Sequence, residues 1–272
     1  MVTSIPLRDG RSVPAIGFGV YKVDDAEAET AVGTALDSGY RHVDTAEMYG
    51  NETGVGKAIR ASRLDRDDVF VTTKVWNSNQ GRDATLRAFD ASLDRLGLDA
   101  VDLYLIHWPA AANDRYVETW RTLVELRESG RARSVGVSNF QVPHLERIIA
   151  ETGEVPAVNQ VERHPWLPQR ELIAFHEQHD IVTEAWSPLG RGRLMDEPVL
   201  AGIAATHGVS VAQVLVRWNV QQSVVVLPKS VTPARIASNI DVDRFALTDD
   251  ELAAIAGLES GDRTGSHPDS VS

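Results

Sequence analysis

The chain contains no cysteine. It therefore has no disulfides, no thiolate metal site and no cysteine nucleophile, which is compatible with a reducing cytosol. No apolar run approaches the roughly 20 residues that span a bilayer. The first ten residues, MVTSIPLRDG, lack the basic segment and apolar core of a signal peptide. We therefore expect a cytoplasmic protein with no membrane partner.

Positive charge is also scarce. Lys and Arg number 27 against 39 Asp and Glu, so the formal net charge is -12. This balance argues against a nucleic-acid partner, because binding the phosphate backbone requires a basic face. The dinucleotide fingerprint G-x-G-x-x-G is missing as well, since GFGVYK and GVGKAI both fail at the third glycine. A Rossmann-type cofactor site is therefore not indicated.

What is present is a regular alternation of short β-like runs with amphipathic helical patterns. The expected strands are Ala15–Val20, His42–Ala46, Val69–Lys74, Val101–His107, Ser134–Asn139, Ala157–Gln160, Ile181–Trp186 and Val224–Lys229. The expected helices are Ala26–Ser38, Glu52–Ser62, Asp83–Leu96, Arg115–Ser129, Pro143–Glu151, Gln169–His179 and Val211–Gln221. Such alternation predicts βαβ units and a parallel sheet.

Eight units within 272 residues favour a closed (β/α)8 TIM barrel of the α/β class over an open sheet. The dipeptide Asp9-Gly10 predicts an N-terminal β-hairpin. The polar, Gly- and Ser-containing end, ESGDRTGSHPDSVS, predicts a loose C-terminal tail. We expect a single domain over residues 1–272.

Polar or aromatic side chains follow most of the predicted strands. They are Asp44, Lys74, His107, Ser138, Asn139, Gln160, Trp186, Lys229 and Ser230. A single polar strand end can mean only that the strand stops there. In a barrel, however, all carboxyl ends meet at one face, where the active sites of this fold are built. Together these residues predict a functional site at that face.

Three of these side chains, together with Tyr49, suit proton donation to a carbonyl oxygen. A phenol has a pKa of about 10, and an ammonium nearby lowers it. Lys74 can act in this way on Tyr49, and Asp44 can keep the buried ammonium charged. His107 can add a hydrogen bond that orients the carbonyl. We therefore predict that Lys74 lowers the pKa of Tyr49.

The stretch LPKSVTPARIASN predicts an anion site. Thr232 is a candidate N-cap and Pro233 suits the first helical turn. The free N–H groups and the dipole of such a helix attract an anion, and Lys229 and Arg235 add positive charge. An ordinary capped helix with surface cations remains the alternative at this point.

The motifs GYRHVDTAEMYGNE, LYLIHWP, VGVSNF and LPKS resemble those of the aldo-keto reductases, notably short bacterial members similar to 2,5-diketo-gluconate reductases and the prostaglandin F synthase-like group. The resemblance implies reduction of aldehydes and ketones by hydride transfer from NADPH, without a metal. It makes Tyr49 the general acid, Asp44 and Lys74 its tuning pair, and His107 the residue that orients the substrate. It also favours a monomer.

The same resemblance assigns the cofactor residues. Ser138, Asn139 and Gln160 match positions that hold the nicotinamide amide, and Trp186 matches the aromatic on which the ring stacks. The remaining matches are Ser187 and Leu189 at the pyrophosphate, and Lys229, Ser230, Val231, Arg235 and Asn239 at the adenosine end. Ser238 and Thr232 depart from the family, where Glu or Gln and a further Arg are common.

Four residues are expected to form an apolar wall around the reacting carbonyl: Tyr21, Met48, Trp76 and Trp108. Glu47 would disfavour anionic substrates if it faced this pocket, and Arg191 and Arg193 could counter it. The helical segment HEQHD (176–180) contains possible metal ligands, but we interpret it as a solvated helix face. No specific substrate is predicted.

Two other functions remain open at the level of sequence. One is a non-catalytic NADP(H)-binding sensor or regulatory subunit, which the presence of all four catalytic residues disfavours. The other is a metal-dependent barrel hydrolase. It would need several His or Asp ligands at strand ends, and only Asp44 and His107 qualify.

Overall fold

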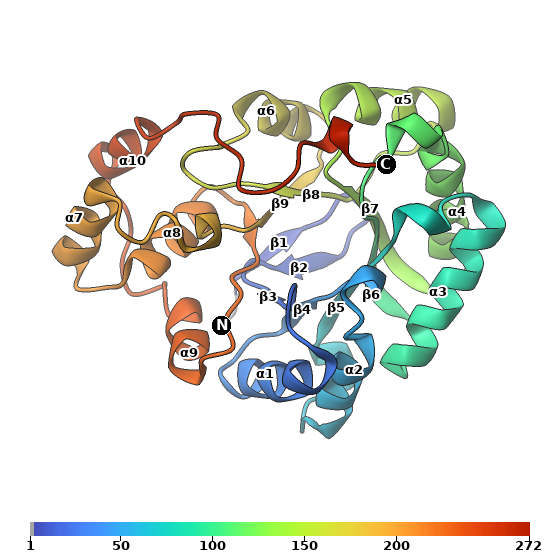
Figure 1. The fold of residues 1–272 in the computed structure, drawn as a ribbon, viewed down its shortest axis with the longest axis horizontal. Coiled ribbons are helices and arrows are strands. Elements are labelled where there is room, and N and C mark those ends of the chain that lie inside the picture. Colours follow the sequence, from blue (N-terminus) through green and yellow to red (C-terminus); the bar gives the residue numbers. More distant parts are fainter. Residues whose placement is uncertain (1–2) are drawn as a thin grey trace.

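A computed structural model describes residues 3–272, so the first two residues of the predicted domain lie outside the described residues. Eight parallel strands follow one another in chain order around the sheet (Figure 1). They are β3 (Phe18–Gly19), β4 (His42–Asp44), β5 (Phe70–Val75), β6 (Val101–Ile106), β7 (Ala132–Ser138), β8 (Val158–Glu162), β9 (Val182–Trp186) and β10 (Val225–Val226). Each predicted strand is confirmed, with shorter bounds at both ends of the chain.

The last strand returns to the first and closes the barrel. Ile16 forms a parallel bridge with Val226. The amide of Gly17 donates to the Val226 carbonyl at 2.9 Å, and the amide of Val226 donates to the Ala15 carbonyl at 2.9 Å. We call these bonds between residues 15–17 and Val226 the seam. The predicted (β/α)8 barrel is therefore confirmed.

The helices surround the strands (Figure 1). They are α1 (Asp25–Asp37), α2 (Glu52–Ala61), α3 (Arg82–Leu96), α4 (Tyr116–Glu128), α5 (Val142–Thr152), α6 (Arg170–Gln178), α7 (Pro198–His207), α8 (Val211–Val220), α9 (Pro233–Ile240) and α10 (Asp249–Ala256). The sequence interpretation missed α7 and α10. Within residues 3–272, no single helix is long and apolar enough to cross a membrane, and only α7 and α8 together, bent by 88°, meet that test.

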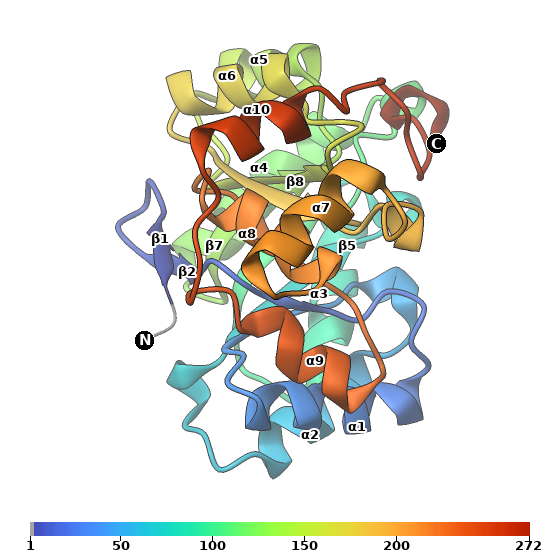
Figure 2. The same ribbon diagram turned by 90° about the vertical axis from the view of Figure 1, so that its left-hand side faces the viewer.

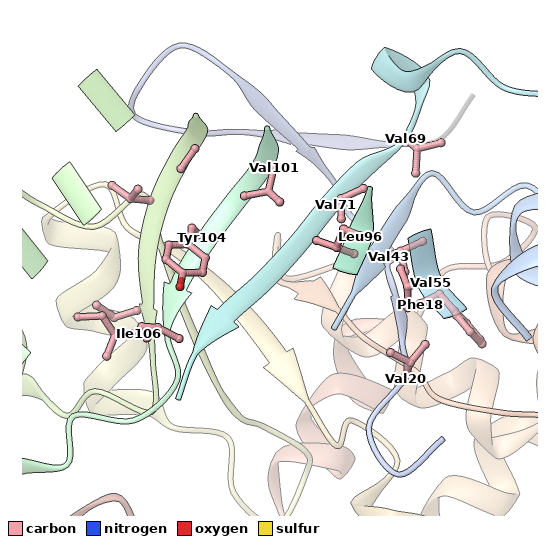
Figure 3. Close-up of a cluster of buried hydrophobic side chains, with 14 of the residues drawn as sticks. Phe18, Val20, Val43, Val55, Val69, Val71, Leu96, Val101, Tyr104 and Ile106 are labelled. Carbon is pink, nitrogen blue, oxygen red and sulfur yellow. The ribbon is translucent and has the colours of Figure 1, made fainter. Parts of the chain in front are cut away.

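Side chains alternate between two environments along each strand, as a period of two requires. On β6, Tyr104 and Ile106 belong to the large core between strands and helices (Figure 3). Leu103 and Leu105 belong instead to a smaller inner cluster with Leu7 of the hairpin. On β4 and β5 the same alternation sends polar residues into the barrel, and these form the base of the site.

The predicted hairpin consists of β1 (Ser4–Pro6) and β2 (Ser12–Pro14), paired antiparallel. Gly10 in its turn has φ +84°, a conformation that glycine adopts without a steric penalty. Figure 2 shows the hairpin on one side of the molecule and the C-terminal end on the opposite side. The hairpin therefore leaves the carboxyl ends of the strands free.

The tail after α10 has little regular structure, but it is held to the barrel by Glu162 at the end of β8. The carboxylate of Glu162 accepts from the Thr264 amide at 2.6 Å and from the Gly265 amide at 3.2 Å. Burial alone would raise the pKa of Glu162, but hydrogen bonds from His164 and Thr264 outweigh it and lower the pKa to about 2. We call this contact the tail clasp.

Candidate active site

A cavity of about 810 Å³ opens at the carboxyl ends of the strands. Most of the predicted site residues line it: Tyr21, Asp44, Met48, Tyr49, His107, Trp108, Ser138, Asn139, Gln160, Trp186, Ser187, Leu189, Lys229, Ser230, Arg235 and Asn239. They come from nearly every strand end and from α9. The convergence that the strand ends predicted is therefore present in the folded chain.

Three predicted residues do not line the cavity. Lys74 lies beneath it and is fully buried. Trp76 packs edge-on against His107, with ring centroids 5.1 Å apart. It therefore supports the His107 ring and does not itself line the cavity. Val231 is 38% exposed and lies outside the cavity lining.

The Lys74 ammonium has all three of its N–H groups occupied. It donates to the two carboxylate oxygens of Asp44 at 2.7 and 2.8 Å, and to the Thr45 carbonyl at 2.8 Å. β4 and β5 pair in register and bring these residues together because His42, Asp44, Thr72 and Lys74 alternate inward. A buried ammonium requires such compensation. The predicted Asp44–Lys74 pair is present.

Tyr49 lies in a short 3-10 turn (Glu47–Tyr49) just before α2. Lys74 Nζ is 5.1 Å from the centroid of its ring, and the His107 ring centroid is 5.6 Å away. Burial, followed by the charge of Asp44, raises the pKa of Tyr49 well above its ordinary value. The shift is opposite to the one expected from Lys74, because burial and the charge of Asp44 outweigh the lysine. Tyr49 is therefore a neutral phenol that keeps its proton.

His107 follows β6 and is also neutral. Burial, and secondarily the Lys74 charge, lowers its pKa well below the ordinary value. Its Nδ1 atom is buried and has no hydrogen-bond partner among residues 3–272. A neutral imidazole retains one N–H donor, which can serve a carbonyl oxygen without a net charge.

Glu47 does not line the cavity. Its carboxylate accepts from the backbone amide of Trp76 at 2.9 Å and from the side chain of Asn79. The acid therefore holds the loop after β5 against the turn that carries Tyr49. Its predicted effect on anionic substrates has no geometric basis.

Asn139 lies next to the cavity with its polar atoms largely committed. Its amide nitrogen donates to the His107 carbonyl and to Ser138 Oγ, both at 3.0 Å. Its oxygen accepts from the Trp186 indole at 2.8 Å. An amide oxygen has two lone pairs, so Asn139 offers the cavity one acceptor and no donor.

The other end of the cavity carries positive charge at the start of α9. Lys229 and Arg235 are exposed there. Thr232 is the N-cap, as predicted, but its side chain makes no capping bond to α9. Ser230 Oγ instead accepts from the Thr232 amide at 3.1 Å. Pro233 has no N–H group, and the amides of Arg235 and Ile236 donate to the Thr232 carbonyl at 3.0 Å. In the first turn, the amide of Ala234 is therefore left for an anion, beside the two cationic side chains.

The model of the Aldo/keto reductase family matches residues 15–260. The chain belongs to this family. The resemblance carried by its motifs is confirmed, and with it the assignment to the oxidoreductases.

Curated relatives match this aldo/keto reductase over nearly their whole length. An aldo-keto reductase of Mycolicibacterium smegmatis is 54% identical over 268 residues, covering 98% of both chains. The methylglyoxal reductase DkgA of Escherichia coli K12 is 46% identical over 269 residues, covering 98% of this chain and 97% of its own.

Solved structures agree with the fold. An aldo/keto reductase from Brucella melitensis has a TM-score of 0.93 at 51% identity, covering 95% of this chain and all of its own. A mutant of Gox0644, solved in complex with NADPH, has a TM-score of 0.96 at 46% identity, covering 100% of this chain and 99% of its own.

The interpretation of residues 176–180 as a solvated helix face was wrong for His176. His176, in the segment taken as a solvated face, is buried and bonds Asn159 at 2.9 Å and Thr183 at 2.8 Å. Its ring therefore joins α6 to β8 and β9. In the part of the chain that the structure describes, no three His, Asp or Glu side chains lie close enough to hold a metal ion.

The sequence interpretation missed several residues of the cavity wall. Lys22, Met195, Ser210 and Val211 line the cavity, as does Arg191, which was considered only as a countercharge. It also missed Glu184, which is fully buried inside the barrel. A signal was available, because Glu184 lies two residues before Trp186 on a strand and so shares its face.

Proposed function

We propose that this aldo/keto reductase reduces small aldehydes and ketones, including dicarbonyl compounds and keto-sugars, to alcohols with NADPH. The main support is that a single cavity is lined by the neutral phenol of Tyr49, the neutral imidazole of His107 and the cations at the start of α9. The name of the relative DkgA, methylglyoxal reductase, supports a small dicarbonyl as substrate. The NADPH complex of Gox0644 supports the cofactor.

The residues of the cavity fit this cofactor. Lys229, Arg235 and the amide of Ala234 suit phosphate, and the additional 2′-phosphate favours NADPH over NADH there. Trp186 offers a ring face for stacking, and the free acceptor of Asn139 suits the amide N–H of a nicotinamide. Ser187 and Leu189 lie between these ends. When bound, NADPH supplies the hydride.

Tyr49 acts as the general acid. As the carbonyl carbon is reduced, negative charge develops on its oxygen, and the Tyr49 hydroxyl donates its proton there. A raised pKa keeps this proton in place at neutral pH, and the alkoxide is basic enough to take it. His107 donates a hydrogen bond to the same oxygen, and both groups stabilise the developing charge. Lys74 lies beneath Tyr49, held there by Asp44, and its ammonium is a nearby positive charge when the phenolate forms.

The test is a Tyr49→Phe variant assayed with NADPH and methylglyoxal or 4-nitrobenzaldehyde by the loss of nicotinamide absorbance. Loss of a general acid lowers the rate by about 10²- to 10⁴-fold, while NADPH binding should be retained. Tyr21→Phe is the matched control, because it removes a hydroxyl from the same cavity and should keep most of the activity. Full activity in Tyr49→Phe would remove the acid role from this residue.

A wider panel of carbonyl compounds, assayed with NADPH and NADH side by side, separates catalysis from mere binding. A reductase turns over several of them and prefers NADPH. Tight NADPH binding with negligible turnover across the panel would instead support the non-catalytic sensor.

A further inference from the structure

Glu184 is a buried acid that the proposed reaction does not use. It lies on β9, inside the barrel, one strand away from Gln160 on β8. Its Oε2 atom accepts from Gln160 Nε2 at 2.9 Å, and its Oε1 atom lies 3.6 Å from His42 Nε2. A carboxyl group in a barrel interior lowers stability unless it is hydrogen-bonded or paired.

Gln160 connects Glu184 to the catalytic ion pair. The same Nε2 atom also donates to Asp44 Oδ2 at 2.8 Å. An amide nitrogen has two protons, so both donors of Gln160 are used inside the barrel. Asp44, paired with Lys74, can only accept, which fixes the direction of one of these bonds.

The side-chain oxygen of Gln160, Oε1, is the one side-chain polar atom of this residue that has no hydrogen-bond partner among the described residues. Gln160 lines the cavity, and within residues 3–272 no hydrogen bond reaches its Oε1 atom. The backbone carbonyl of Gln160 is already taken by Ser138 Oγ at 2.8 Å and the Asn139 amide at 2.9 Å. Together with the free lone pair of Asn139, this side of the cavity therefore presents two acceptors.

We propose that Glu184 is a positioning residue of the cofactor site: by accepting the second amide proton of Gln160, it keeps Gln160 Oε1 turned towards the cavity, so that the site selects the N–H groups of a carboxamide. This inference rests on the proposed NADPH dependence and deepens it. Glu184 acts through Gln160 and does not line the cavity itself.

The reverse orientation of Gln160 is least favourable when both acids are present. If the amide turned over, its oxygen would face the carboxylate of Asp44 and the Oε2 atom of Glu184. Without Glu184, one proton of Gln160 would be buried without an acceptor. Only the bond to Asp44 then holds the amide, and the turned orientation becomes less unfavourable because it frees this N–H group. The preference of the site for a donor would weaken.

The test compares binding of NADP+ with binding of its 3-acetylpyridine analogue, in which a methyl ketone replaces the carboxamide and no N–H donor remains. Dissociation constants are measured by calorimetry for the wild type, Glu184→Leu and Glu184→Gln. One lost hydrogen bond corresponds to about a tenfold change in Kd. We expect the wild type to prefer NADP+ by about that factor.

Glu184→Leu should lose part of this preference, because only Asp44 then holds Gln160 Nε2 inside the barrel. Glu184→Gln should keep it, because its amide oxygen still accepts from Gln160 Nε2. Glu162→Gln, a buried acid of the neighbouring strand that does not contact Gln160, is the control and should also keep it. If Glu184→Leu does not fold, Glu184→Thr replaces it, since its side chain is too short to reach Gln160.

The outcomes distinguish the proposed cofactor from the proposed role of Glu184. Failure of the wild type to bind NADP+ would overturn the proposed cofactor. A wild type that binds NADP+, with an unchanged preference in a folded Glu184→Leu or Glu184→Thr, would overturn the role of Glu184 alone.

Discussion

At the scale of single residues, the site depends on how completely one lysine is satisfied. Lys74 is fully buried, and each of its three N–H groups meets an oxygen of Asp44 or Thr45. Such a pair contributes little net stability as a unit, but removal of one partner leaves an uncompensated charge in the interior. Its value to the protein lies in placing a fixed cation below Tyr49.

We predict that Lys74→Met lowers the free energy of unfolding by about 3–5 kcal/mol, because Asp44 is left as an unpaired buried charge. Denaturation in urea measures the change. Asp44→Asn added to Lys74→Met should recover part of the loss. Lys57→Met is the control, since Lys57 and Glu29 form an exposed pair at 3.9 Å whose worth is about 0–1 kcal/mol. Equal losses from Lys57 and Lys74 would contradict this account.

The buried acid Glu184 should make stability depend on pH. Burial, followed by the charge of Asp44, raises the pKa of Glu184 from 4.5 to about 8. Between these values the unfolded chain has lost the proton and the folded chain keeps it, so stability falls as pH rises. The groups facing Glu184 are His42, Asp44, Gln160 and, through Asp44, Lys74.

The Glu184→Gln side chain does not titrate, so this variant lacks the loss of stability that ionisation of Glu184 causes. We therefore expect its melting temperature to rise relative to the wild type between pH 5 and about pH 8, where the titration ends. Thermal unfolding at a series of pH values measures the difference. A difference that stays constant over this range would mean that Glu184 is ionised in the folded protein.

The sequence was sufficient to predict which side chains meet at the site, because strand alternation and barrel convergence act on residue types alone. Asp44, Tyr49 and His107 line the cavity as expected, above Lys74. The direction of the Tyr49 pKa shift could not be predicted in this way. It depends on burial first and on the charge of Asp44 second, and the depth of burial is not visible in a motif.

At the scale of elements, the strands and most helices followed from periodicity, whereas the end of the chain did not. α10 begins with a capping box between Thr248 and Glu251, a recognisable signal that was overlooked. The tail clasp has no local signal, because Glu162 and Thr264 are far apart in sequence. Contacts of this kind require the folded barrel.

We predict that Glu162→Gln loosens the tail. The neutral amide offers a single oxygen to the amides of Thr264 and Gly265, and charge-assisted bonds of this kind are worth about 1.5–3 kcal/mol. Hydrogen exchange of residues 263–266 should accelerate by about 10-fold or more. Glu259→Gln is the control, because Glu259 forms an exposed pair with Arg170 at 2.6 Å nearby. Unchanged exchange in Glu162→Gln would show that other contacts hold the tail.

At the scale of the whole molecule, the site draws on both ends of the chain. Asp44 and Tyr49 come from the first quarter, while Lys229 and Arg235 follow the last strand. The seam between residues 15–17 and Val226 brings these parts together. The cavity therefore exists only in the closed barrel.

We predict that the two sides of the seam open together. Peptides covering residues 14–19 and 224–228 should show amide exchange with the same opening free energy, because the Gly17 and Val226 amides protect each other's strand. Exchange mass spectrometry under native conditions measures both. Much faster exchange on one side would show that the barrel closes through other contacts.

The seam also has a consequence for how the protein is made. A ribosome releases Ala15–Gly19 early and Val225–Leu227 near the end of synthesis. During that interval β3 has a neighbour on one side only, and its free edge is open to pairing with another nascent chain. Slow synthesis, or a pause before residue 225, would lengthen this exposure. We therefore expect the yield of native protein in cells to depend on how quickly the last third of the chain is translated.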